Sequence, residues 1–160
     1  MGHYYTAQIC KNGHVITANY DKHPEFRKAF CDKCGVATIT HCEGCNKAIR
    51  GRYHSDIRGL PDTYSPPRFC PNCGKPYPWT VSKIQAAKEL VEELDGLDAN
   101  DRRLLGQSLD DLVTESPQTE VASSHFKRIM KKVGKESYDV WKKVVTDLVS
   151  ESMRKILFGP

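Results

Sequence analysis

Four pairs of metal-binding side chains dominate the first 73 residues. All seven cysteines lie there, and six of them form three Cys-x-x-Cys pairs. The seventh precedes a histidine by four residues in the segment ICKNGH, where Asn-Gly favours a tight turn. Gly follows the second cysteine in CDKCG and PNCGK, where the chain can turn back beneath a metal. The four pairs are Cys10/His14, Cys31/Cys34, Cys42/Cys45 and Cys70/Cys73.

Eight such ligands complete two tetrahedral zinc sites with none left over, since thiolate and imidazole are the usual ligands of structural zinc. Seven cysteines cannot all pair as disulfides, and buried core cysteines would not fall into four pairs. Four protein ligands leave no position for a water, so we expect two structural Zn²⁺ ions per chain. Their role would be to fold a segment with little apolar surface of its own.

Three arrangements of the four pairs are open. Chain order places Cys10, His14, Cys31 and Cys34 at one metal, and Cys42, Cys45, Cys70 and Cys73 at the other. A cross-brace joins the first pair to the third and the second to the fourth, whereas a nested arrangement gives residues 31–45 a metal of their own. We favour chain order, because un-nested connections are the topological default.

A change of composition near residues 79–82 divides the chain into two predicted domains. Residues 1–80 hold the cysteines and most of the Pro and Gly, whereas residues 81–160 show helical periodicity. The segments HVITANY and VATIT have the β-branched character of short strands. The predicted fold is a small metal-bound β domain of two zinc ribbons (1–80), followed by an all-α helical bundle (81–160).

About four helices are predicted in the second domain. Ser82 and Gln85 form a capping box before KIQAAKELVEEL, and Gly96 ends that helix. A second helix begins after Asp98 and ends before Pro117, and a third covers about residues 119–133. The last is predicted as one helix over about 136–157, with a near-heptad stripe of Tyr138, Trp141, Val145, Leu148, Ser152 and Ile156.

The segment AIRGRYHSDIRGLPDTYSPPRF (48–69) combines cations with aromatic side chains. Guanidinium groups contact phosphate and aromatic rings stack on bases, so this loop is a candidate nucleic-acid surface. The alternative is a solvated loop whose aromatic residues pack over a zinc site. The candidate binding residues are Arg50, Arg52, Tyr53, Arg58, Arg68 and Lys75.

No nucleophile–base set, phosphate-binding glycine loop or His-Glu-x-x-His motif is present in the sequence. A metal-dependent nuclease would need convergent carboxylates, and the adjacent Asp110 and Asp111 point apart on a helix. We therefore expect a binding protein rather than an enzyme, with a protein–protein adaptor as the alternative to nucleic-acid binding. The basic final helix offers a face for a partner helix or a homodimer.

The sequence predicts no membrane association, because no apolar run approaches transmembrane length and MGHYYTAQIC lacks a signal pattern. We expect a cytoplasmic protein with reduced thiols.

The order ICKNGHVIT, FCDKCGVATITHCEGC, IRGRY and FCPNCGKPYPWT resembles the bacterial domain-of-unknown-function family 2321. Its uncharacterised members look like tandem zinc-ribbon proteins ending in CPNCG-x-P-x-PWT. The resemblance covers about residues 5–95 and implies metal ligands at the same eight positions. It implies no activity, and the general zinc-ribbon analogy points to nucleic-acid or protein binding.

Overall fold

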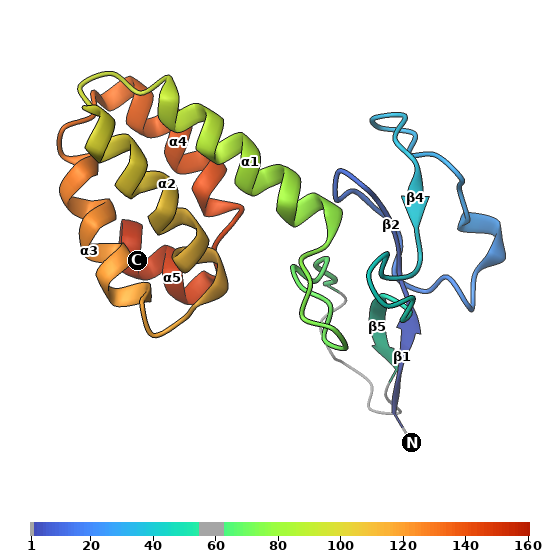
Figure 1. Cartoon of the computed structure of the whole chain (residues 1–160). Coiled ribbons are helices and arrows are strands. Elements are labelled where there is room, and N and C mark those ends of the chain that lie inside the picture. Colours follow the sequence, from blue (N-terminus) through green and yellow to red (C-terminus); the bar gives the residue numbers. More distant parts are fainter. Residues whose placement is uncertain (1, 55–62) are drawn as a thin grey trace. The chain divides into compact units, whose positions relative to one another are not determined.

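The computed structural model describes residues 2–54 and 63–160. The chain forms two compact units, Met1–Ser82 and Lys83–Pro160, called here the N-terminal and C-terminal units. Figure 1 shows short strands and irregular turns in the first unit and helices in the second. Helix α1 (Pro78–Glu92) begins in the N-terminal unit and ends in the C-terminal unit.

Two small antiparallel sheets organise the N-terminal unit. Strand β1 (His3–Thr6) pairs with β5 (Arg50–His54). Strand β2 (Gln8–Cys10) lies between β3 (Val15–Thr17) and β4 (Thr38–Ile39) in the second sheet. A short 3₁₀ helix, η1, covers Pro24–Phe26. The strands predicted within HVITANY and VATIT are confirmed as β3 and β4.

Two residues hold these short strands in register. Gln8 is buried, and its amide nitrogen donates to the Lys28 carbonyl and to Thr38 Oγ1, both at 2.8 Å. Gly51, in β5, is buried against the backbone of Ala18. A Cβ added there would lie 2.2 Å from the Ala18 carbonyl oxygen, a distance that real side chains do not reach. The fold therefore depends on glycine at position 51.

The C-terminal unit is a helical assembly around one apolar core. After α1 come α2 (Ala99–Thr114), α3 (Thr119–Met130), α4 (Lys135–Thr146) and α5 (Glu151–Phe158). The Trp141 ring stacks on Phe126 at a centroid distance of 5.1 Å, and its indole N–H donates to the Ala87 carbonyl. Leu105, Leu109 and Ile129 are fully buried in the same unit.

The helix boundaries differ from the prediction at two points. The first helix begins at Pro78, so Ser82 lies within it and does not cap it. The final segment is two helices, because Ser150 interrupts it and caps α5 by accepting a hydrogen bond from the Met153 N–H at 3.2 Å. The interruption shifts the buried positions, so that Met153 is buried and Ile156 is 52% exposed.

The start of α2 follows the prediction, because the Asp98 side chain accepts a hydrogen bond from the Asp101 N–H at 2.8 Å. The Arg102 guanidinium then donates to the carbonyls of Glu92, Leu94 and Leu97. These carbonyls belong to the last residue of α1 and to the turn that follows it, so Arg102 caps one helix from the next.

Within residues 2–54 and 63–160, no helix is both long enough and apolar enough to cross a bilayer.

Candidate metal centres

The three Cys-x-x-Cys pairs lie on turns with the same hydrogen bonds. In each turn the N–H of the first cysteine donates to the carbonyl five residues later, at 2.8–2.9 Å for Cys31, Cys42 and Cys70. The carbonyl of the same cysteine accepts from the N–H four residues later, at 2.7–2.8 Å. Residues flanking each turn also pair, as in the Phe30–Ala37 bridge. The chain thus repeats one Cys-x-x-Cys turn three times.

Each turn closes through a residue with positive φ immediately after its second cysteine. Gly35 and Gly74 have φ of 71° and 72°, and Asn46 takes this position with φ of 58°. Asn is among the few non-glycine residues that tolerate this conformation. The Cys10/His14 turn differs, because its positive-φ residue is Gly13, one position before the histidine. The sequence prediction noted the glycines and missed the equivalent role of Asn46.

The first cluster brings together Cys10, His14, Cys31 and Cys34. The Nδ1 atom of His14 lies 3.5 Å from Cys10 Sγ and 3.6 Å from Cys31 Sγ. The sulfurs of Cys10 and Cys34 are 3.8 Å apart. All four potential ligand atoms lie within 4.8 Å of one another.

The second cluster is formed by Cys42, Cys45, Cys70 and Cys73, again within 4.8 Å. The sulfurs of Cys42 and Cys73 are 3.7 Å apart, as are those of Cys45 and Cys70. Cys42 and Cys70 are buried, whereas Cys73 is exposed. The clusters follow chain order, so the structure supports neither the cross-brace nor the nested alternative.

These distances match the edges of a zinc tetrahedron. Zn–S bonds of about 2.3 Å and Zn–N bonds of about 2.0–2.1 Å place two sulfurs about 3.8 Å apart, and a sulfur and a nitrogen about 3.6 Å apart. A disulfide would need a separation of about 2.0 Å, and all seven cysteines are free. The two clusters could therefore each hold a tetrahedral metal ion.

Backbone N–H groups favour the thiolate form of two buried cysteines. Burial raises the pKa of Cys31, but hydrogen bonds from the N–H groups of Lys33 and Cys34, together with those of the Cys34 and His14 side chains, lower it to about 7. At Cys70 the same competition, with the N–H groups of Asn72 and Cys73, lowers the pKa to about 6. The thiolate is the form that binds metal, so the lowered pKa values favour Cys31 and Cys70 as ligands.

The second cluster forms part of the core of the N-terminal unit. Cys42 and Cys70 pack with Ile9, Ile49 and the aromatic residues of the PYPWT segment. Tyr77 stacks on Trp79 with ring centroids 4.7 Å apart. Burial and the adjacent Cys70 thiol both raise the pKa of Tyr77, so the phenol stays protonated beside the sulfur.

Residues of the PYPWT segment also hold the chain that leads to Cys70. The Trp79 indole N–H donates to the Pro67 carbonyl at 2.9 Å, and Thr80 Oγ1 donates to the Arg68 carbonyl at 2.8 Å. The first turn of α1 therefore positions the last pair of candidate ligands.

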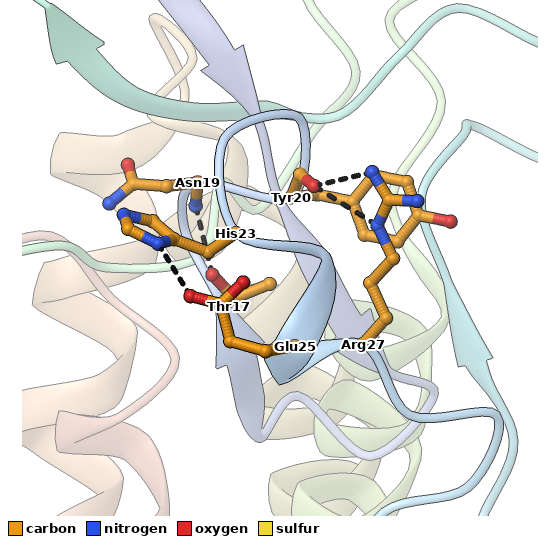
Figure 2. A network of polar contacts seen from close by, with 6 residues as sticks. All are labelled: Thr17, Asn19, Tyr20, His23, Glu25 and Arg27. Carbon is orange, nitrogen blue, oxygen red and sulfur yellow. Dashed lines mark hydrogen bonds and ion pairs between the residues drawn. The ribbon is translucent and has the colours of Figure 1, made fainter.

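The connection from β3 to Cys31 is ordered by local polar contacts (Figure 2). The Arg27 guanidinium donates to the Tyr20 carbonyl at 3.0 and 3.2 Å and lies 4.1 Å from the centroid of the Tyr20 ring. His23 Nδ1 and Glu25 Oε1 are 2.9 Å apart. These contacts fix the path between the two pairs of the first cluster.

The predicted nucleic-acid residues are only partly brought together. Arg50, Arg52 and Tyr53 line an open groove of about 540 Å³ beside β1 and β5. Arg68 and Lys75 do not line it, and Arg58 lies outside the described residues. We call this feature the β1–β5 groove; it is lined by Tyr4, Arg50, Gly51, Arg52, Tyr53, Thr63, Tyr64, Ser65 and Pro67.

The sequence prediction missed Tyr4 as a member of this groove. Its ring lies opposite Tyr53 through the pairing of β1 with β5, which are more than forty residues apart in the sequence. The aromatic HYYT segment was the available signal, but no local pattern indicates its partner strand.

A search of curated proteins and a search of solved structures each found no match to the chain. A family model described as "Uncharacterized protein conserved in bacteria" matches residues 3–157, so the match includes the helices as well as the cysteine pairs. The chain therefore belongs to bacterial domain-of-unknown-function family 2321.

Proposed function

We propose that this chain is a non-catalytic zinc-ribbon protein that binds nucleic acid through the β1–β5 groove. Two Zn²⁺ ions would fold the N-terminal unit and hold the strands that carry the groove. The observation that carries the proposal is the groove itself, where two exposed tyrosines lie beside two arginines at the surface of the N-terminal unit.

The chemistry of the clusters supports a structural role for zinc. One cluster offers three sulfurs and one nitrogen, and the other offers four sulfurs. Each set completes a tetrahedron with protein atoms, so a bound zinc keeps no position for a catalytic water. Neither set includes the carboxylates that Mg²⁺ and Ca²⁺ prefer.

The residue that leads into β5 connects the second cluster to the groove. Ile49 immediately precedes the strand and is fully buried in the core that contains Cys42 and Cys70. Its carbonyl accepts from the Ala7 N–H at 2.8 Å, which joins β5 to the chain between β1 and β2. Metal binding at the second cluster therefore supports the strand that presents Arg50 and Arg52.

Guanidinium groups make phosphate the matching ligand chemistry. Two arginine–phosphate contacts predict a slope of log K against log[salt] of about −1.4 for a single strand and about −1.8 for a duplex. A single-stranded ligand should then lose about sevenfold in affinity between about 50 and 200 mM salt. A binding interface built on apolar burial would depend much less on salt.

The test is fluorescence anisotropy of the zinc-loaded protein with labelled single-stranded and duplex DNA and RNA across a salt series. Arg50→Gln should weaken binding and reduce the slope by about 0.7 on single strands. Lys75→Gln is the matched control, because it removes one positive charge from the same unit outside the groove. Absence of binding at low salt, or equal effects of the two variants, would contradict the proposed surface.

A protein partner is the second candidate, supported by a groove in the C-terminal unit. The groove is open, measures about 530 Å³ and has apolar walls that include Phe126, Met130 and Leu157. Lys127 and Lys131 lie at its rim, and neither forms an ion pair within the described parts of the chain. This chemistry fits an amphipathic helix with acidic residues beside its apolar face.

A synthetic peptide with leucines on one helical face and glutamates beside them would probe this second candidate. Replacing both rim lysines with glutamate should abolish binding, whereas Lys143→Glu, outside the groove, should preserve it. Failure of the peptide to bind wild-type protein at low salt would reject this candidate.

A further inference from the structure

Tyr4 and Tyr53 form an exposed aromatic pair on the surface of the N-terminal unit. They are register partners in the β1–β5 sheet, and their ring centroids lie 4.9 Å apart at an interplanar angle of 60°. Tyr4 is 53% exposed and Tyr53 is 46% exposed. The pair thus presents ring surface to solvent.

An irregularity in the strand register adds a cation to this pair. Arg50 and Tyr53 are three positions apart, so a regular strand would place them on opposite faces. The register shifts between Tyr4 and Thr6, and the Arg50 guanidinium carbon lies 5.1 Å from the centroid of the Tyr4 ring. Tyr4 therefore contacts both residues.

The backbone of Arg50 is held by another residue that lines the groove. The Tyr64 hydroxyl donates to the Arg50 carbonyl at 2.7 Å. Burial raises the pKa of Tyr64, so its hydroxyl remains a donor at neutral pH. This contact fixes the start of β5, while the Arg50 side chain stays exposed beside the Tyr4 ring.

We infer that Tyr4, Tyr53 and Arg50 form a stacking platform that selects single-stranded nucleic acid over duplex. This inference rests on the proposed nucleic-acid function and names the strand form that the groove accepts. Bases in a duplex are covered on both faces by their neighbours, whereas unpaired bases expose a face to an aromatic ring. The guanidinium beside Tyr4 would contact the phosphate that accompanies a stacked base.

The experiment compares labelled oligo(dT) as a single strand with the same strand annealed to oligo(dA), using the zinc-loaded full chain. Wild-type protein should bind the single strand at least about fivefold more tightly, which corresponds to stacking of one base. This comparison needs no variant, so it does not depend on how a substitution folds.

Variants separate stacking from phosphate contact. Tyr4→Ala and Tyr53→Ala should each weaken single-strand binding by about fivefold or more, with an unchanged salt slope. Replacing either tyrosine with phenylalanine should retain binding, because a ring remains. Tyr20→Ala is the matched control, since it removes the ring of another Tyr–Arg pair, with Arg27, outside the groove.

The outcomes distinguish this inference from the function on which it rests. Equal affinity for single strand and duplex, or alanine variants that bind like wild type, would overturn the platform. If binding then still depends on salt and on Arg50, the proposed nucleic-acid function stands without it. Absence of binding to either form at low salt would overturn both.

Discussion

Removing zinc should unfold the N-terminal unit and leave the C-terminal unit folded. Structural zinc contributes about 10–16 kcal/mol to folding in finger peptides, whereas an entire small domain is stable by only about 5–15 kcal/mol. The core beside the second cluster contains seven buried residues, and two of these are candidate ligands. Without metal, this unit cannot offset the entropy of ordering its turns.

The two tryptophans allow each unit to be followed separately. Trp79 is 3% exposed and stacks on Tyr77 in the N-terminal unit. Trp141 is 1% exposed and stacks on Phe126 in the C-terminal unit. Trp141→Phe therefore leaves a reporter of the first unit, and Trp79→Phe leaves a reporter of the second.

The assay is tryptophan emission during titration with a zinc chelator, with the zinc content measured at each step. Trp79 emission should move to the red as zinc is lost, while Trp141 emission stays unchanged. Far-ultraviolet circular dichroism should retain most of the helical signal. A buried Trp79 spectrum in verified zinc-free protein would show that the N-terminal unit folds without zinc, and a simultaneous shift of both reporters would show that the two units do not unfold independently.

Three further substitutions test other parts of the structure. His14→Ala should reduce zinc per chain from two towards one by elemental analysis while the helices remain folded, and two tightly held zincs would exclude His14 as a ligand. Gly51→Ala should lower the thermal midpoint of the N-terminal unit, because its Cβ would meet the Ala18 carbonyl oxygen; an unchanged midpoint would contradict the close approach. The Lys132 ammonium, 2.7 Å from an Asp101 carboxylate oxygen, lowers the pKa of Asp101 below 3.8. The pair's stabilisation is therefore present above about pH 4 and lost as pH falls through the folded-state pKa. In the Asp101→Asn variant, the free energy of unfolding measured with denaturant should fall less as the pH is lowered than it does in wild type. An equal loss in both proteins would contradict a stabilising role for this pair.

The metal clusters could be predicted because their information is local. The members of each pair are three or four positions apart in the sequence, and the un-nested order of the pairs gave the correct grouping. Asn46 was missed because the expected closing residue was glycine, although Asn tolerates the same positive φ.

The helix boundaries were harder because local patterns competed with tertiary contacts. The Ser82–Gln85 pattern predicted a helix start at Lys83, five residues after the actual start at Pro78. Burial of Trp79 and Thr80, with their bonds to the preceding loop, moves the start of α1 back to Pro78. In the final segment the continuous apolar spacing predicted a single helix and gave no indication of the break at Ser150. The signal available for that break was the preference of serine for the N-cap position of a helix.

The groove was predicted only in part because it depends on long-range pairing. Arg50, Arg52 and Tyr53 lie on one strand and could be found together in the sequence. Tyr4 joins them only through the β1–β5 pairing and its shifted register. Arg68 instead supplies its backbone carbonyl to Tyr77 and Thr80, a role that its charge did not indicate.

X-ray absorption at the zinc edge can establish whether the two clusters bind zinc as separate tetrahedral sites. Measured together with metal content on protein purified without chelator, it should give two zincs per chain. Their combined first shells should contain seven sulfurs at about 2.3 Å and one nitrogen at about 2.0 Å, with no shell of bound water. Fewer than two metals, iron in place of zinc, or sulfur–sulfur bonds of about 2.0 Å would contradict the account.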